Sequence, residues 1–216
     1  MKLPFTNRAA AGQVLAAALA TYRDQKNILV LALPRGGVPV AYEVASALGA
    51  PLDLVLVRKL GVPGQRELAM GAIASDGTKV LNREIIKSLQ ITHEDIERVQ
   101  REEEQELARR EQTYRGDQVR LEIQGKTIIL VDDGVATGAT MRAAVSLLRT
   151  QNPGRIVIAL PVAPAEVIDL LRREADEVIC LHCPEPFLAI GCWYQEFTQV
   201  SDREVCDILA RARRPS

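Results

Sequence analysis

Residues 128–140 read Ile-Ile-Leu-Val-Asp-Asp-Gly-Val-Ala-Thr-Gly-Ala-Thr. The apolar run at 128–131 is typical of a buried strand, and a helical pattern follows the loop of small residues. Backbone N–H groups of such a loop, and the N-terminus of the helix after it, attract a phosphate. An acidic, glycine-rich turn without a ligand is the alternative. The order of strand, acids, loop and helix favours a site for a phosphorylated ligand.

Short apolar runs alternate with helical patterns along the rest of the chain. The runs cover residues 28–33, 52–57, 127–131, 156–160 and 178–181, and the helical patterns cover 38–48, 139–150 and 164–173. Strands that are apolar on both faces are typical of a parallel sheet covered on both sides. The sequence therefore predicts an α/β fold, with a central, mostly parallel sheet flanked by helices and ligands at the carboxyl ends of the strands.

Two segments interrupt this alternation. Residues 69–81 carry the turn sequence Ser75-Asp76-Gly77 and predict a hairpin. Residues 92–114 predict a long charged helix, with Thr92 and Asp95 as a capping box. Its thin apolar seam favours a solvated helix beside the sheet, with a partner-facing helix in a homodimer as the alternative. Residues 115–125 predict a loop.

Composition limits the class of protein. The chain has 216 residues, enough for one domain, and is 47% hydrophobic and 25% charged. With a net charge of -1, the chain has no excess of basic residues that would bind nucleic acid or an anionic membrane surface. No run of about 18 apolar residues predicts a transmembrane helix. The Ala-rich segment 9–20 predicts a first helix capped by Asn7, with a secretion signal as the alternative.

The four cysteines gather near the C-terminus, at Cys180, Cys183, Cys192 and Cys206. The spacing in Cys180-Leu-His-Cys183 is compatible with a metal ligand pair, but the other two cysteines are poorly placed to complete a zinc site. Small apolar residues at a strand end are the simpler interpretation. Reduced thiols and a cytoplasmic location are the default expectation.

The stretch at 128–140 resembles the signature that binds 5-phosphoribosyl-1-pyrophosphate (PRPP) in type I phosphoribosyltransferases: apolar strand, two acids, three small or apolar residues, then Thr-Gly-x-Thr. The chain is also similar to a bacterial and archaeal branch of that family that combines Pro-Arg-Gly-Gly-Val-Pro, Gly-Ala-Ile-Ala and Pro-Glu-Pro-Phe. The resemblance implies that Asp132 and Asp133 hold the ribose hydroxyls. It assigns the 5′-phosphate to the phosphate loop, which consists of Ala136, Thr137, Gly138, Ala139 and Thr140.

The loop after the first strand reads Leu33-Pro-Arg-Gly-Gly-Val-Pro39. Its two glycines let the backbone approach a ligand closely, and Arg35 supplies a permanent cation. The resemblance implies that Arg35, Gly36 and Gly37 bind pyrophosphate and that the Pro34–Arg35 peptide bond is cis. A tight turn with a solvated arginine is the alternative.

The pair Arg58-Lys59 follows the second apolar run. It resembles the adenine and orotate members of the family, in which such a pair begins a mobile loop that closes over the site. The resemblance implies such a loop over residues 59–68 and a contact of Arg58 and Lys59 with pyrophosphate. No residue stands out as a general base that would take the proton of the acceptor. Glu67 is the one candidate.

Aromatic residues gather near the C-terminus, at Phe187, Trp193, Tyr194 and Phe197. The resemblance implies a small hood that recognises the acceptor, here built from residues 1–23 and 183–216 on a core of 24–182 within a single domain. Phe187 and Trp193 are the candidate contacts to the acceptor, because aromatic faces stack on bases. Packing within the hood is the alternative.

The resemblance implies transfer of the phosphoribosyl group to a nitrogen acceptor, a nucleobase or related heterocycle, with release of pyrophosphate. Asp132, Asp133, Arg58 and Lys59 are the candidate catalytic residues. Mg²⁺ is the expected cofactor, held mainly through PRPP rather than by protein ligands. A homodimer is expected, without nucleic-acid or membrane partners. The alternative is a regulatory protein that binds PRPP without chemistry, and the sequence does not identify the acceptor.

Overall fold

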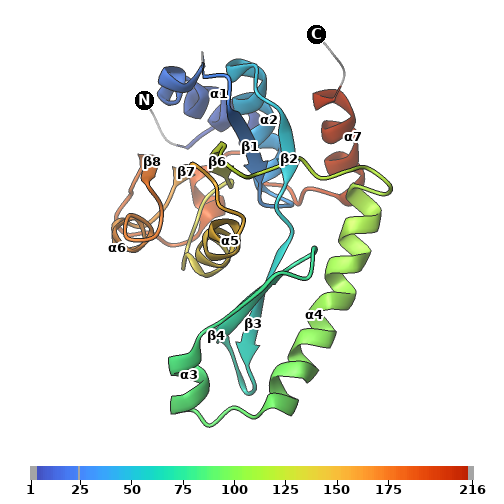
Figure 1. The fold of residues 1–216 in the computed structure, drawn as a ribbon. Helices are drawn as coiled ribbons and strands as arrows, with labels where there is room; N and C mark the ends of the chain where they lie inside the picture. The colour runs from blue at the N-terminus through green and yellow to red at the C-terminus, as the bar shows by residue number, and fades with distance from the viewer. Residues whose placement is uncertain (1–3, 24, 214–216) are drawn as a thin grey trace. The chain divides into compact units, whose positions relative to one another are not determined.

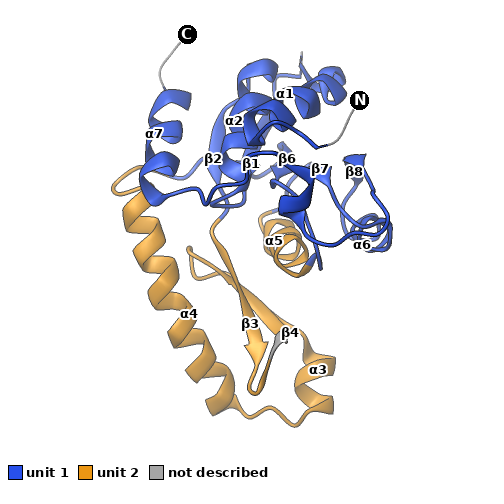
Figure 2. Cartoon of the chain, turned by 180° about the vertical axis from the view of Figure 1, so that it is seen from behind, with its two compact units in different colours: residues 1–55, 120–138, 152–216 blue, residues 56–119, 139–151 orange. Residues whose placement is uncertain are grey.

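The computed structural model describes residues 4–23 and 25–213. The chain divides into two compact units, coloured separately in Figure 2. The first unit takes residues 1–55, 120–138 and 152–216, and the second takes 56–119 and 139–151. The chain passes from the first unit to the second between Gly138 and Ala139, in the middle of the predicted phosphate loop. The division into a core and a hood remains a prediction.

The first unit is built on a five-stranded parallel sheet in the order β2-β1-β6-β7-β8 (Figure 1). Its strands are β1 (Ile28–Ala32), β2 (Leu52–Leu54), β6 (Thr127–Val131), β7 (Arg155–Val162) and β8 (Glu177–His182). All five residues of β1 are buried, as are four of the five in β6. This confirms the predicted α/β fold and explains why the central runs are apolar without alternation.

Four α-helices of the described residues belong to the first unit: α1 (Arg8–Ala18), α2 (Gly37–Leu48), α6 (Ala165–Leu171) and α7 (Asp202–Ala212). Two 3₁₀ turns, Ala20–Tyr22 and Ile190–Trp193, add to them. The Asn7 cap of α1 is confirmed, because its side chain accepts the Ala10 N–H at 3.0 Å. A methyl group at Gly12 would lie 2.7 Å from the Val40 carbonyl oxygen, so this glycine lets α1 and α2 pack closely.

The two ends of the first unit pack on each other. The backbone of Phe5 bonds at 2.8 Å to Trp193 on one side and to Gln195 on the other. Phe5 and Tyr194 are buried in one apolar cluster with Ala11 and Val162. Residues around Phe5 and residues 193–195, which both belong to the predicted hood, are therefore packed together.

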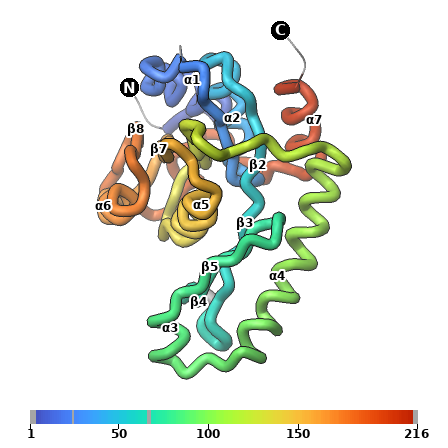
Figure 3. Tube along the Cα trace, in the orientation of Figure 1, coloured from blue at the N-terminus to red at the C-terminus, as the bar shows by residue number. Residues whose placement is uncertain are grey.

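The second unit contains a three-stranded antiparallel sheet, β3-β4-β5, whose path is clearest in Figure 3. Its elements are β3 (Val57–Val62), β4 (Gln65–Ala74), β5 (Lys79–Leu81), α3 (Arg83–Ser88), α4 (His93–Tyr114) and α5 (Ala139–Arg149). The hairpin predicted over 69–81 is confirmed, and Gly77 takes a φ of 83° in its turn. The predicted loop at 115–125 also contains no helix or strand.

The predicted loop over residues 59–68 is wrong, because these residues form the β3–β4 hairpin. The predicted strand 52–57 is correspondingly divided between β2 and β3. Pro63 and Gly64 make the turn, and Gly64 has a φ of 78°. A Pro-Gly pair between strands is typical of a type II turn, so the signal was present in the sequence.

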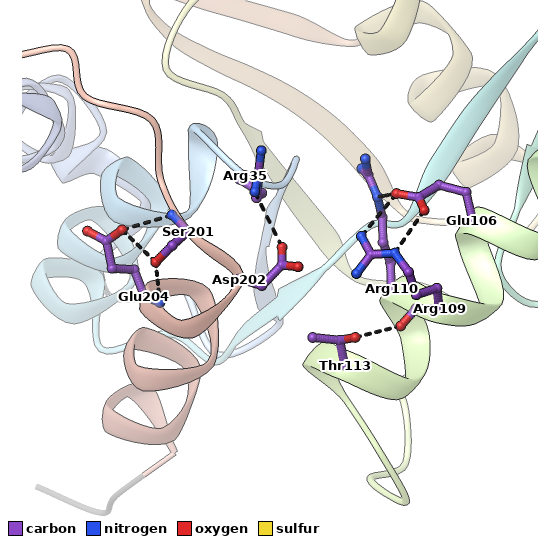
Figure 4. Close-up of polar contacts among 8 residues, drawn as sticks. All are labelled: Arg35, Glu106, Arg109, Arg110, Thr113, Ser201, Asp202 and Glu204. Carbon is purple, nitrogen blue, oxygen red and sulfur yellow. Dashed lines mark hydrogen bonds and ion pairs between the residues drawn. The ribbon is translucent and has the colours of Figure 1, made fainter.

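Helix α4 confirms the predicted long charged helix. Thr92 accepts the Asp95 N–H at 3.1 Å, and Asp95 accepts the Thr92 N–H in return. The helix packs against the β3–β4 hairpin of the same unit, and its buried residues are Ile96, Leu107 and Tyr114. Hydrogen bonds from Arg109 and Arg110 hold the pKa of Glu106 at about 2, well below its usual value (Figure 4). These observations leave the homodimer a prediction.

Candidate functional site

Neighbouring parallel strands bring two of the predicted loops together. β1 and β6 pair in register up to Ala32 and Val131, so the loops that follow them leave the same edge of the sheet. The Leu33 N–H donates to the Val131 carbonyl at 3.0 Å. The loop with Arg35 and the loop with the two acids are therefore in contact.

The two glycines of the first loop face the end of β6. A methyl group at Gly36 would lie 2.1 Å from Asp133 Oδ2, and one at Gly37 would lie 2.7 Å from the Val131 carbonyl oxygen. Packing against the end of β6 and the loop that carries Asp132 and Asp133 (the acid loop) is thus a sufficient reason for glycine at both positions. Their contact with a ligand remains a prediction. The Pro34–Arg35 peptide bond is cis, as the resemblance implied.

The two acids after β6 have different surroundings. Asp132 is half-buried, and its Oδ1 accepts the backbone N–H of Asp133 at 2.8 Å. Burial, followed by the negative charge of Asp133, raises the pKa of Asp132 well above its usual value. Asp133 is buried, and its Oδ2 accepts a hydrogen bond from Arg8 Nε at 2.7 Å.

Arg8 contacts the candidate site, although nothing in the sequence marks it. It begins α1, and its guanidinium also donates to the Thr198 carbonyl at 2.7 Å and lies 3.9 Å from the centroid of the Phe197 ring. Tyr194 also bonds to Asp133, because its hydroxyl donates to the Asp133 backbone carbonyl at 2.5 Å. An arginine next to a helix cap looks like any solvated arginine in the sequence, so no local signal identified it.

Arg35 is paired with an acid of the C-terminal helix. Its guanidinium lies 3.6 Å from Asp202, and both side chains are 33% exposed (Figure 4). Asp202 is the first residue of α7, directly after Ser201, which caps the helix through a reciprocal bond with Glu204. Arg35, the residue predicted to bind pyrophosphate, therefore has the carboxylate of Asp202 near it.

The phosphate loop leads from the acids toward α5. Ala136 and Thr137 are exposed, and Gly138 takes a φ of 77°, a conformation that glycine adopts at little cost. Ala139 and Thr140 open α5 and belong to the second unit. The exposed loop before a helix fits the predicted character of a phosphate site, and its role remains a prediction.

Arg58 and Lys59 lie on β3 of the second unit. Arg58 Nε is 2.5 Å from Glu103 Oε2 of α4, and its side chain is 37% exposed. Lys59 is half-buried beside it. Their contact with pyrophosphate stays a prediction, and the side chain of Glu67 lies outside the described residues.

The aromatic candidates of the C-terminal segment pack on the protein. The rings of Phe187 and Trp193 lie 6.3 Å apart, and both pack against the cluster around Phe5 and Tyr194. The Trp193 indole nitrogen is buried and has no hydrogen-bond partner among the described residues. This arrangement supports the packing alternative, and contact with an acceptor remains a prediction.

The cysteines are not joined by disulfides within the described structure. Burial raises the pKa of Cys180 to about 12, with the neighbouring Cys183 as a further cause. No group of three or more His, Cys, Asp or Glu side chains that could hold a metal ion lies together in residues 4–23 and 25–213. Within the same residues no helix is both long and apolar enough to cross a membrane.

Comparison with known proteins agrees with this geometry. The family described as phosphoribosyl transferase domain matches residues 5–190. Two Mycobacterium tuberculosis proteins, from strains CDC 1551 / Oshkosh and ATCC 25618 / H37Rv, carry the name "Putative phosphoribosyl transferase" and are 45% identical over 214 residues. That alignment covers 99% of this chain and 48% of each relative, so the chain spans about half the length of these relatives.

The crystal structure of TT1426 from Thermus thermophilus is 40% identical, with a TM-score of 0.86, over 98% of this chain and 99% of that one. The structure of AQ2163 from Aquifex aeolicus, 10% identical, shares the fold at a TM-score of 0.50 over 85% of this chain and 78% of that one. The α/β fold with two acids after its central strand thus defines the class, and the chain belongs to the phosphoribosyltransferase family.

Proposed function

We propose that the chain binds PRPP and transfers its phosphoribosyl group to a nitrogen acceptor, with release of pyrophosphate. One observation carries the proposal: the glycine loop with Arg35 contacts the loop with Asp132 at the ends of adjacent parallel strands. A cation for pyrophosphate and a carboxylate for ribose hydroxyls thereby reach the same edge of the sheet. Membership of the family supports the same chemistry.

In the proposed reaction the bond from C1 of the ribose to pyrophosphate breaks as the acceptor nitrogen bonds to C1 from the opposite side. Positive charge develops on the ribose and negative charge on the leaving group. Asp132 is the more exposed of the two acids. Its carboxylate accepts hydrogen bonds from the ribose hydroxyls and stabilises the positive charge that develops on the ribose. Arg35 neutralises pyrophosphate as it leaves, with Arg58 and Lys59 as further candidates.

Mg²⁺ fits this site only as an ion carried largely by the substrate. Asp133 is engaged by Arg8, and no cluster of three ligating side chains exists among the described residues. Asp132 is the carboxylate that remains available, and Mg²⁺ commonly binds through one or two carboxylates together with substrate phosphates. When bound, the ion neutralises pyrophosphate and makes it a better leaving group.

A P-loop kinase is one competing function, because residues 125–127 read Gly-Lys-Thr, as the end of a P-loop motif does. This tripeptide leads into strand β6 rather than into a helix, and Arg120 stands where a P-loop requires its first glycine. A regulator that binds PRPP without turnover is the stronger rival. Its expected binding site is the same, so only a reaction assay separates the two.

The test is release of pyrophosphate from Mg·PRPP in the presence of pooled nucleobases and other nitrogen heterocycles, against a sample without acceptor. Acceptor-dependent release is expected, and division of the pool then identifies the acceptor. A parallel calorimetric titration with PRPP interprets a negative result. Binding without release would favour the regulator, whereas absence of binding would refute the proposed function.

A further inference from the structure

Arg8 joins three parts of the first unit through one side chain. Its Nε bonds to Asp133 after β6, and its Nη1 bonds to the Thr198 carbonyl of the C-terminal segment. The guanidinium also lies over the ring of Phe197, at a distance where a cation and an aromatic face attract each other. The side chain is only 11% exposed, and its bond to Asp133 is partly buried, whereas the bond to Thr198 lies at the surface.

Asp133 is held in one orientation by these neighbours. Its Oδ2 lies between Arg8 and the Cα of Gly36, where not even a methyl group fits. Its backbone carbonyl accepts the hydroxyl of Tyr194, a residue that stacks on Phe197 at 5.1 Å. The position of the acid loop thus depends on the docking of residues 194–198.

We propose that Arg8 is a positioning residue of the ribose site, which fixes the Asp133 carboxylate and couples the docking of residues 194–198 to the binding of PRPP. The inference rests on the proposed function, because it assigns the ribose to the acid loop. Arg8 acts through Asp133 and does not itself contact the ligand. Without Arg8, the buried Asp133 carboxylate lacks its cation and loses the contact that holds it in this orientation.

Lysine cannot replace arginine fully at this position. The guanidinium donates in two directions at once while its flat face lies on an aromatic ring, whereas an ammonium group is a compact charge. Arg8→Lys therefore retains the charge opposite Asp133 but loses the bond to Thr198 or the contact with Phe197. It should fall between the wild type and Arg8→Gln.

The experiment measures calorimetric binding of Mg·PRPP and of Mg·pyrophosphate to the wild type, Arg8→Gln, Arg8→Lys and Arg211→Gln. Arg211 is the matched control, since it lies in the last turn of α7 on the same unit, with its guanidinium 5.2 Å from the ring of Tyr42. Pyrophosphate lacks the ribose, so it reports on the site without the acid loop. Thermal melting of each variant checks folding.

We expect Arg8→Gln to weaken PRPP binding about ten- to a hundredfold, the range lost with one charge-assisted hydrogen bond, and to change pyrophosphate binding less than about twofold. Arg8→Lys should lose an intermediate factor, and Arg211→Gln should bind both as the wild type does. Equal PRPP affinity in Arg8→Gln and the wild type would overturn the inference. So would an equal loss for both ligands, which indicates general damage rather than positioning.

If Arg8→Gln does not fold, Arg8→Lys decides: a loss confined to PRPP supports the inference, and wild-type affinity for both ligands overturns it. Failure of the wild type to bind PRPP is a separate outcome. That result refutes the proposed function and removes the ribose assignment on which the role of Arg8 depends.

Discussion

Asp133 donates its backbone N–H to the carboxylate of Asp132 at 2.8 Å, yet only one of these two neighbouring carboxylates has a cation beside it. Asp133 has the guanidinium of Arg8 at 2.7 Å. Asp132 has no ion pair within the described part of the chain, and burial beside Asp133 raises its pKa. The charge of Asp132 therefore costs the folded protein free energy, whereas the charge of Asp133 is compensated.

Asp132→Asn should make the protein more stable and bind PRPP more weakly. The folded pKa of Asp132 is above the unfolded value of about 3.9, so its stability cost is absent at low pH and complete above the folded pKa. The amide keeps the acceptor for the Asp133 N–H and removes the charge. We expect a higher Tm at pH 7, a smaller difference near pH 4, and a PRPP affinity about tenfold lower or more.

Asp133→Asn should have the opposite effect on stability. It leaves the guanidinium of Arg8, 11% exposed, without its counter-ion, and breaking a buried pair from one side costs about 3 kcal/mol. Urea denaturation at pH 7 without ligand measures the change in the free energy of unfolding. Equal destabilisation by Asp132→Asn and Asp133→Asn would contradict the distinction drawn between the two acids.

The sequence predicted the parts of the site that depend on local order along the chain. An apolar run followed by acids and glycines indicated where β6 ends. The pairing of β6 with β1, which places the Arg35 loop beside the acid loop, came from the structure and not from the sequence. The Asn7 cap and the Thr92 capping box were readable because each is a contact across three residues. Such features need no knowledge of the tertiary structure.

The sequence could not predict the long-range partners. Arg8 and Asp133 are separated by 125 positions, and Arg8 and Thr198 by 190, so nothing in the local sequence links them. The β3–β4 hairpin was misjudged for a different reason. The resemblance implied a mobile loop over 59–68, whereas the Pro63-Gly64 pair is a turn between two paired strands.

Asp202→Asn should raise the affinity for Mg·pyrophosphate. The Asp202 carboxylate lies 3.6 Å from Arg35 and competes with an anionic ligand for that guanidinium. The pair is partly exposed, so its contribution is at most about 1 kcal/mol, and a gain of up to about fivefold in affinity is expected by calorimetry. The loss of an acid from the first turn of α7 should lower the Tm slightly.

Asp207→Asn is the control for that prediction, because Asp207 lies on the same helix and pairs with the exposed Arg203, at 3.9 Å. Its pyrophosphate affinity should equal that of the wild type. The same gain in both variants would indicate a general charge effect, and no gain in Asp202→Asn would show that Asp202 does not compete for Arg35.

Gly37→Ala should destabilise the protein more than Gly36→Ala. At Gly37 the added methyl group meets the Val131 carbonyl at 2.7 Å and the Asp132 Cα at 2.9 Å, and this backbone belongs to the central sheet or follows it directly. At Gly36 it meets the end of the Asp133 side chain, which can rotate at the expense of its bond to Arg8. Overpacking costs about 1–3 kcal/mol, and Gly37→Ala should lie at the upper end in urea denaturation.

Gly36→Ala should instead be the variant that loses PRPP affinity out of proportion to its stability, since the displaced group is the Asp133 carboxylate. Calorimetry of both variants at a temperature where each is folded separates the two effects. A larger stability loss in Gly36→Ala would mean that Asp133 is held more rigidly than the sheet backbone.

Tyr22→Phe should protect the protein against alkaline pH. The Tyr22 hydroxyl donates to Glu177 Oε2 at 2.5 Å, and burial, followed by this bond and the charge of Glu177, raises the Tyr22 pKa to about 12. An unfolded chain releases this proton near pH 10, so the stability that Tyr22 contributes is complete below pH 10 and is lost as pH rises toward 12. Urea denaturation of both proteins at pH 9 and pH 11 measures the loss. The wild type should lose more free energy of unfolding than Tyr22→Phe between these values, by about 1.4 kcal/mol at most. Other groups titrate in both proteins and cancel in the comparison, so an equal loss would mean that the Tyr22–Glu177 bond does not hold the proton.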